Sequence, residues 1–134
     1  MYIHIGFFIF FCEALFSQNT DRIKLQYQAS SDPDQKANLL IKTGHLLEKK
    51  NLDSSLFYYK KALTLEKKIT DTILAKVYCN IGTANLLKGN IDICLEYQLK
   101  ALKIYERYPA QPDVIKVYNS MALVYFYQGY FEIA

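Results

Sequence analysis

The sequence is poor in residues that punctuate a chain: it has no tryptophan, 3 prolines and 5 glycines among 134 residues. So few turn-forming residues leave little room for the many tight turns of an all-β fold, and long lysine- and leucine-rich stretches favour helices instead. Histidine is also scarce, with 2 residues, which excludes triads and metal clusters built on histidine. The 3 cysteines form neither a Cys-x-x-Cys redox pair nor a zinc pair, and no glycine-rich phosphate loop is present. The residues therefore predict no enzyme, no metal site and no cofactor.

The charge is modest and evenly spread. The 16 basic and 13 acidic residues give a net charge of +3, and the lysines are scattered rather than gathered in one stripe. A nucleic-acid interface usually needs a concentrated basic surface, so we expect none here. Hydrophobic residues make up 51% of the chain, which predicts a folded protein with the length of one domain or a few repeats.

The first eleven residues, MYIHIGFFIFF, contain no lysine, arginine, aspartate or glutamate, and a polar run begins at Ser17. This apolar stretch is shorter than the roughly 20 residues that cross a bilayer as a helix. It matches the hydrophobic region of a secretory signal, so we predict a signal peptide over residues 1–17 and an exported protein in the periplasm or on the extracytoplasmic face. The alternative is an N-terminal segment buried in the fold. Residues 18–32 are predicted to form a short helix from Asp21 to Ala29 and a linker.

Helix signals recur after this leader. Asp32 is a candidate N-cap, Pro33 suits a first helical position, and Gln35 could close a capping box. Asp53 and Asp71 are candidate N-caps of later helices, and Pro112 is expected to open another helix. Two glycines are expected to end helices in the left-handed conformation, Gly89 and Gly129.

Small residues recur at a nearly constant interval. Gly44, Gly82 and Ala122 are separated by 38 and 40 residues, and Ala62 and Ala101 by 39. A third series consists of Ser55, Cys94 and Ala134. A helix–turn–helix unit that repeats at this interval is the signature of a solenoid, in which small residues let paired helices cross closely while large side chains fill the flanks.

The repeated pattern resembles the tetratricopeptide repeat (TPR), a helix-pair motif. The second copy reads Tyr78-x-x-Ile81-Gly82, then Cys94-x-Glu96-Tyr97 with Tyr97 as the aromatic, then Lys100-Ala101-Leu102. The resemblance covers about 100 residues and implies an all-α, right-handed solenoid of antiparallel helix pairs, with about two and a half repeats over 33–134. We place the repeats at approximately 33–70, 71–109 and 110–134, the last one truncated. They are longer than the usual 34 residues, a property that resembles extracytoplasmic regions of bacterial signalling proteins.

In this family the first helix of each pair lines a concave groove that binds a peptide or a partner helix. Carried over to this sequence, the groove positions are Asn38, Ile41, His45, Lys76, Cys79, Thr83, Leu86, Lys116, Asn119, Leu123 and Phe126. The resemblance also implies that Cys79 faces the groove and Cys94 the core, so we expect no disulfide between them. A clamp for a terminal carboxylate is not expected, because only Asn80 and Lys116 match its five polar positions.

These observations predict a module that binds a protein or peptide, as the sensory or scaffolding part of a longer bacterial signalling protein. The alternative is a free-standing scaffold for an envelope complex, with no signalling output. Carbohydrate capture is a weaker prediction, since only Phe126 is suitably placed among the aromatic residues. A membrane contact is expected only through a region downstream of residue 134, and self-association could occur through the unfinished last repeat.

Overall fold

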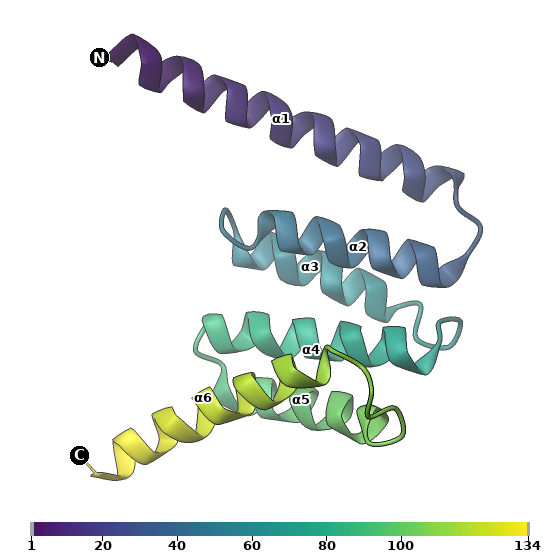
Figure 1. Cartoon of the computed structure of the whole chain (residues 1–134), viewed down its shortest axis with the longest axis vertical. Helices are drawn as coiled ribbons and strands as arrows, with labels where there is room; N and C mark the ends of the chain where they lie inside the picture. Colours follow the sequence, from purple (N-terminus) through teal and green to yellow (C-terminus); the bar gives the residue numbers. More distant parts are fainter. Residues whose placement is uncertain (1, 134) are drawn as a thin grey trace.

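The structure is a computed structural model that describes the backbone of residues 2–133 and the side chains of residues 4–129. Its described part is entirely helical and contains no strand. The elements are α1 (Tyr2–Ala29), α2 (Pro33–Leu47), α3 (Leu52–Leu63), α4 (Asp71–Leu87), α5 (Ile91–Tyr105) and α6 (Val114–Ile133). Helices α2 and α3 form one antiparallel pair, α4 and α5 form the next, and α6 lies against the second pair (Figure 1). The predicted all-α solenoid of helix pairs is confirmed.

Helix α1 differs from the short helix that we predicted. It runs without a break from Tyr2 through Ala29, because no proline or left-handed glycine interrupts it. Its second half belongs to the fold: Ile23 is buried and Tyr27 packs against the core of the first pair. Its first half extends away from the pairs (Figure 1), and Ile5 and Phe7 are 54% and 73% exposed. A buried N-terminal segment, the alternative to a signal peptide, is therefore excluded for these residues.

The N-terminus of α2 confirms the capping prediction only in part. Asp32 is the N-cap of α2, its side chain accepting from the backbone N–H of Asp34 at 3.0 Å, and Pro33 is the first helical residue. The capping box predicted for Gln35 does not form. The hydroxyl of Ser30 instead accepts from the backbone N–H of Asp32 and donates to the side-chain carbonyl of Gln35. A serine just upstream therefore satisfies the group that a capping box would use.

Two other predicted caps, Asp53 and Asp71, are wrong. Asn51 caps α3, where it accepts from the backbone N–H of Ser54 at 3.0 Å, and Asp53 in the first turn pairs with Lys88. Asp71 is the first residue of α4 and pairs with Arg107 at 3.1 Å. In both cases the acidic side chain lies inside the helix: Asp53 binds a cation at the end of α4, in the next pair, and Asp71 binds one directly after α5, its own partner helix.

Of the two glycines that were predicted to end helices, Gly89 does so and Gly129 does not. Gly89 has a φ of +81°. The N–H groups of Gly89 and Asn90 donate to the carbonyls of Leu86 and Asn85, which is the Schellman arrangement. Gly129 lies inside α6, which continues to Ile133, so the predicted stop is wrong there. Glycine permits the left-handed conformation but does not impose it. Pro112 likewise lies in the turn before α6, which begins two residues later.

The small residues mark the crossing of each pair. A Cβ added to Gly44 would overlap the ring of Tyr59, and one added to Gly82 would lie 2.8 Å from Nε2 of Gln98. Tyr59 and Gln98 are separated by 39 residues and are both fully buried. They occupy the same position in successive repeats. Tyr97, which we assigned to the aromatic position, lies one residue earlier and is only partly buried.

Candidate protein-binding site

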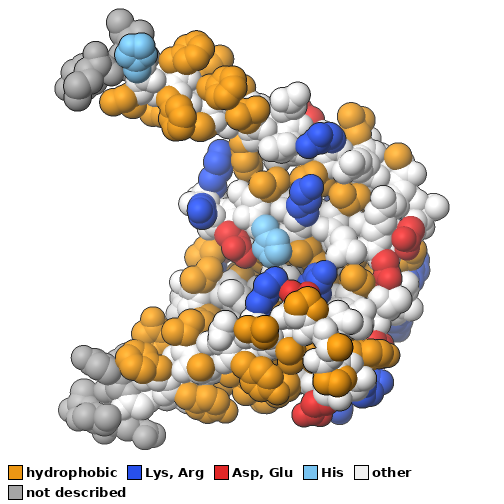
Figure 2. Space-filling model, in the orientation of Figure 1, with side chains coloured by type: hydrophobic (Ala, Val, Ile, Leu, Met, Phe, Trp, Pro, Cys, Tyr) orange, Lys and Arg blue, Asp and Glu red, His pale blue; other side chains and the backbone are white. Residues whose placement is uncertain are grey.

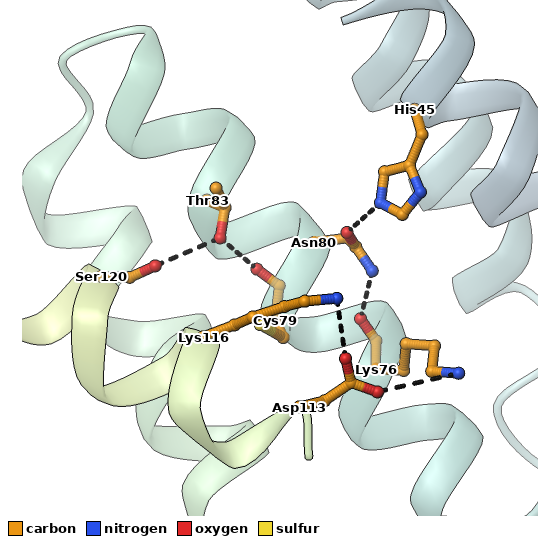
Figure 3. A network of polar contacts seen from close by, with 8 residues as sticks. All are labelled: His45, Lys76, Cys79, Asn80, Thr83, Asp113, Lys116 and Ser120. Atoms are coloured by element: carbon orange, nitrogen blue, oxygen red, sulfur yellow. Dashed lines mark hydrogen bonds and ion pairs between the residues drawn. The ribbon is translucent and has the colours of Figure 1, made fainter.

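The first helices of the repeats, α2, α4 and α6, contribute neighbouring side chains to one face, which we call the shared face. Two equivalent hydrogen bonds join them. The Nε2 of His45 lies 2.6 Å from Oδ1 of Asn80, and the hydroxyl of Thr83 lies 3.2 Å from that of Ser120 (Figure 3). His45 and Thr83 each follow a crossing glycine, while Asn80 precedes one by two residues and Ser120 precedes Ala122 by two. The hydrogen bond between α2 and α4 and the one between α4 and α6 therefore join equivalent positions of successive repeats.

The orientation of Asn80 fixes the proton on His45. The amide nitrogen of Asn80 donates to the backbone carbonyl of Lys76 at 2.8 Å, which turns its Oδ1 toward the imidazole. That oxygen can only accept, so the Nε2 of His45 carries the proton and donates it. The edge of the same imidazole packs on Tyr59, with ring centroids 5.7 Å apart. The middle of the shared face is thus ordered by contacts that reach into the core.

Asp113 organises the charges beside α6. Its carboxylate lies 2.8 Å from the ammonium of Lys116 and 3.7 Å from that of Lys76 (Figure 3). The hydrogen bond to this carboxylate raises the pKa of Lys116, so that side chain stays cationic. Two lysines share the carboxylate of Asp113, so this cluster has a surplus positive charge, while the carboxylate of Glu48 also lines the hollow. Figure 2 shows lysine and arginine side chains around a histidine on this side of the molecule.

A hollow of about 310 Å³ lies on the shared face, between α2, α4 and α6. It is lined by His45, Glu48, Cys79, Asn80, Thr83, Lys116, Asn119 and Ser120. Five of the groove residues named from the sequence are among them: His45, Cys79, Thr83, Lys116 and Asn119. Polar atoms from three helices thus converge on one concavity of a size that accepts a few side chains of a peptide.

The remaining predicted groove residues lie elsewhere. Ile41 is 4% exposed and belongs to the core, so its assignment to the groove is wrong. It points inward because α4 packs on that side of α2. Lys76 is tied to Asp113, and Leu86 is half-buried. Three residues are exposed outside the hollow: Asn38, Leu123 and Phe126.

Sequence reasoning missed Glu48 and Ser120, and it named Asn80 only as a match to a carboxylate clamp. Glu48 accepts a hydrogen bond from the hydroxyl of Tyr59 at 2.5 Å, which holds its carboxylate at the edge of the hollow. Asn80 and Ser120 could have been found from the repeat register, since each stands two residues before a small crossing residue.

Cys79 contributes a thiol to the lining of the hollow, and its surroundings make it a poor nucleophile. Burial raises the pKa of its thiol to about 11, so the reactive thiolate is scarce at neutral pH. Cys94 is also buried, and both cysteines are free thiols. Within the described residues no three side chains among histidine, cysteine, aspartate and glutamate converge to hold a metal ion. The hollow offers hydrogen-bonding groups and charged side chains to a ligand.

Residues 75–108, which cover most of α4 and all of α5, match the family model of the tetratricopeptide repeat. The match identifies this segment as a tetratricopeptide repeat within the helical array, and such repeats serve as protein-interaction modules. A search among curated proteins gave no match. No helix within the described residues has both the length and the apolar character needed to cross a membrane.

Proposed function

We propose that the shared face of α2, α4 and α6 binds a peptide or helix of another protein. The observation that carries this proposal is the hollow of about 310 Å³, in which residues from all three first helices converge. Beyond the hollow, α6 adds the exposed apolar side chain of Leu123, which is 48% exposed. Hydrogen-bonding groups beside an apolar anchor are the usual parts of a peptide site.

The binding test uses peptides selected from a displayed random 12-residue library against the full chain. Their affinity is then measured for a double variant, Leu123→Arg with Lys76→Glu, which removes the apolar anchor and reverses one charge. We expect at least tenfold weaker binding, because truncated anchors commonly cost about 2 kcal/mol. The matched control is Leu99→Arg with Lys103→Glu, on the exposed surface of α5. Equal affinity of both double variants, with unchanged helicity by circular dichroism, would show that the shared face is not the binding site.

We further propose that the protein works outside the cytoplasm, as the sensory or scaffolding part of a longer signalling protein. The support is the uncharged N-terminal stretch, which remains exposed on the first half of α1 and fits a signal peptide removed after Ser17. Such a cut would leave Ile23 and Tyr27, the residues that attach α1 to the first pair. N-terminal sequencing of exported protein should then begin at Gln18, and a chain that stays uncut in the cytoplasm would contradict export. A free-standing envelope scaffold is the second candidate and shares these expectations.

A further inference from the structure

A second pocket shares no lining residue with the hollow. It has a volume of about 390 Å³ and forms where α1, α2 and α3 meet, so we call it the α1–α3 pocket. Every residue that α1 contributes lies between Thr20 and Tyr27, after the predicted cut at Ser17. The pocket would therefore persist in a processed chain.

The walls of the α1–α3 pocket are mainly apolar. Ile23 and Leu40 are buried at its base, and Leu39, Leu47 and Tyr58 line its sides. Two threonines also line it, but their hydroxyl protons are used within their own helices. Thr20 donates to the carbonyl of Ser17 at 2.8 Å, and Thr43 donates to that of Leu39 at 2.9 Å. The interior thus suits a hydrocarbon better than a polar ligand.

The rim of the pocket is cationic. Lys24 and Lys61 line it and are exposed, and neither is in an ion pair in the described part of the chain. The ammonium groups of Lys61 and Lys36 lie 5.5 Å and 5.3 Å from the ring centroid of Tyr27. Asp21 is the one acidic residue in the lining. Cations without carboxylate partners at the mouth of an apolar pocket favour a ligand with an anionic head.

The connections between helices explain why a pocket forms here. Between α3 and α4 the connecting segment supplies Leu65 and Ile69, which pack against the core. The segment between α1 and α2 is Ser30-Ser31-Asp32 and contains no apolar side chain. The connection between α1 and α2 therefore adds no apolar side chain to the space beside α1.

We propose that the α1–α3 pocket binds an anionic amphiphile: a single alkyl or acyl chain among Ile23, Leu39 and Leu40, with its acidic head between Lys24 and Lys61. The volume lies within the range of about 300–1,000 Å³ that is usual for small-molecule sites. Binding there would attach α1 to α2 and α3 at once, and the ligand would therefore stabilise the folded state. This inference does not depend on peptide binding by the shared face.

The probe is sodium dodecanoate, titrated calorimetrically into the full chain below its micelle-forming concentration. Dodecylamine and dodecyl maltoside serve as cationic and neutral probes with the same alkyl chain. We expect dodecanoate to bind at one site, to raise the thermal midpoint, and to bind at least tenfold more tightly than dodecylamine. Leu39→Trp should weaken dodecanoate binding at least tenfold by filling the pocket, whereas Leu99→Trp on the exposed face of α5 should not.

A charge variant keeps the test valid if Leu39→Trp fails to fold. Lys24→Glu with Lys61→Glu changes two exposed side chains and should weaken dodecanoate binding at least tenfold while leaving dodecyl maltoside binding unchanged. Lys60→Glu with Lys103→Glu is the matched control, since both lysines are exposed and neither lines the pocket. Absent binding, equal affinity for the two charged probes, or loss on Phe7→Ser with Phe10→Ser rather than on the pocket variants would overturn the proposal. The last result would place the amphiphile on the first half of α1.

Discussion

The two complete helix pairs solve the same packing problem with different chemistry. In α2–α3 the crossing glycine, Gly44, faces the aromatic ring of Tyr59; in α4–α5, Gly82 faces the amide of Gln98. Both opposing residues are fully buried. The comparison shows that the repeat conserves a geometry, a close approach of two backbones, and not one type of side chain.

The two buried side chains also differ in how their polar atoms are satisfied. The hydroxyl of Tyr59 donates to Glu48 at 2.5 Å, and its ring contacts His45. The amide nitrogen of Gln98 lies 3.3 Å from both the carbonyl of Cys79 and the hydroxyl of Thr83, while its Oε1 has no hydrogen-bond partner among the described residues. An unpaired buried carbonyl costs free energy. We therefore expect the first crossing to be the more rigid of the two and the second to be the more tolerant of substitution.

The largest effect is expected from adding one methyl group at each crossing. In Gly44→Ala the new Cβ would overlap Cε1 of Tyr59 and lie 2.7 Å from Cδ1, and this ring is held in place by Glu48. We expect a loss of about 3 kcal/mol in the free energy of unfolding. Gly82→Ala should cost about 1 kcal/mol, because the nearest atom is the end of the flexible Gln98 side chain. Urea denaturation followed by circular dichroism measures both.

Gly129→Ala is the control for these two variants. No atom lies within 4 Å of a Cβ at Gly129, which is inside α6, so alanine should stabilise the helix by up to about 1 kcal/mol. Equal costs at Gly44 and Gly82 would show that the two crossings are equally rigid, against the comparison drawn above.

An intermediate effect is expected from alkaline pH, which should lower the free energy of unfolding first through the second crossing and, at higher pH, through the first. Burial raises the pKa of Cys79, beside Gln98, to about 11, and burial also raises the pKa of Tyr59. A raised pKa means that the folded state favours the protonated form. Each buried group therefore makes its full contribution to the free energy of unfolding at pH values below its pKa in the unfolded chain, which is about 8.5 for cysteine and about 10 for tyrosine. The contribution is lost as the pH rises above that value.

Urea midpoints between pH 7 and pH 11, in reducing agent, measure this loss. The slope should approach about 1.4 kcal/mol per pH unit for each group. Cys79→Ala should reduce the loss of stability that begins near pH 8.5, to which Cys94 also contributes, because burial raises its pKa too. Tyr59→Phe should reduce the loss that begins near pH 10, to which Tyr105 also contributes for the same reason. Tyr118→Phe, which changes an exposed tyrosine of α6, is the control. An unchanged profile in Tyr59→Phe would show that this hydroxyl does not couple the first crossing to pH.

The sequence predicted the crossings because their signal is strong and periodic. Gly44 and Gly82 are 38 residues apart, and at both positions an added Cβ would collide with the side chain of the partner helix. The aromatic position was assigned to Tyr97 instead of Gln98, because a buried glutamine resembles a surface residue in sequence. The 39-residue interval between Ala62 and Ala101 also relates Tyr59 to Gln98, and the structure shows both side chains fully buried opposite the crossing glycines.

The helix caps and part of the site could not be predicted for a different reason. Asp53 and Asp71 have the composition of caps, but each finds a cation contributed by a distant part of the chain, Lys88 and Arg107. Local propensity carries no information on such partners. The assignment of Ile41 to the groove was wrong for the same reason: the packing of α4 on α2 decides which face of α2 is covered.

The smallest effect is expected from replacing the polar residue of the second crossing by an apolar one. Gln98→Leu keeps much of the side-chain volume and removes the Oε1 that has no partner. The hydroxyl of Thr83 would keep its contacts with Ser120 and with the carbonyl of Cys79. We therefore expect a gain in unfolding free energy of no more than about 1 kcal/mol. The reciprocal change, Tyr59→Leu, should instead cost about 2–3 kcal/mol, because it opens a cavity and leaves Glu48 without its donor. A loss above about 2 kcal/mol in Gln98→Leu would mean that the amide holds Thr83 and Cys79 in place, and that the second crossing is as specific as the first.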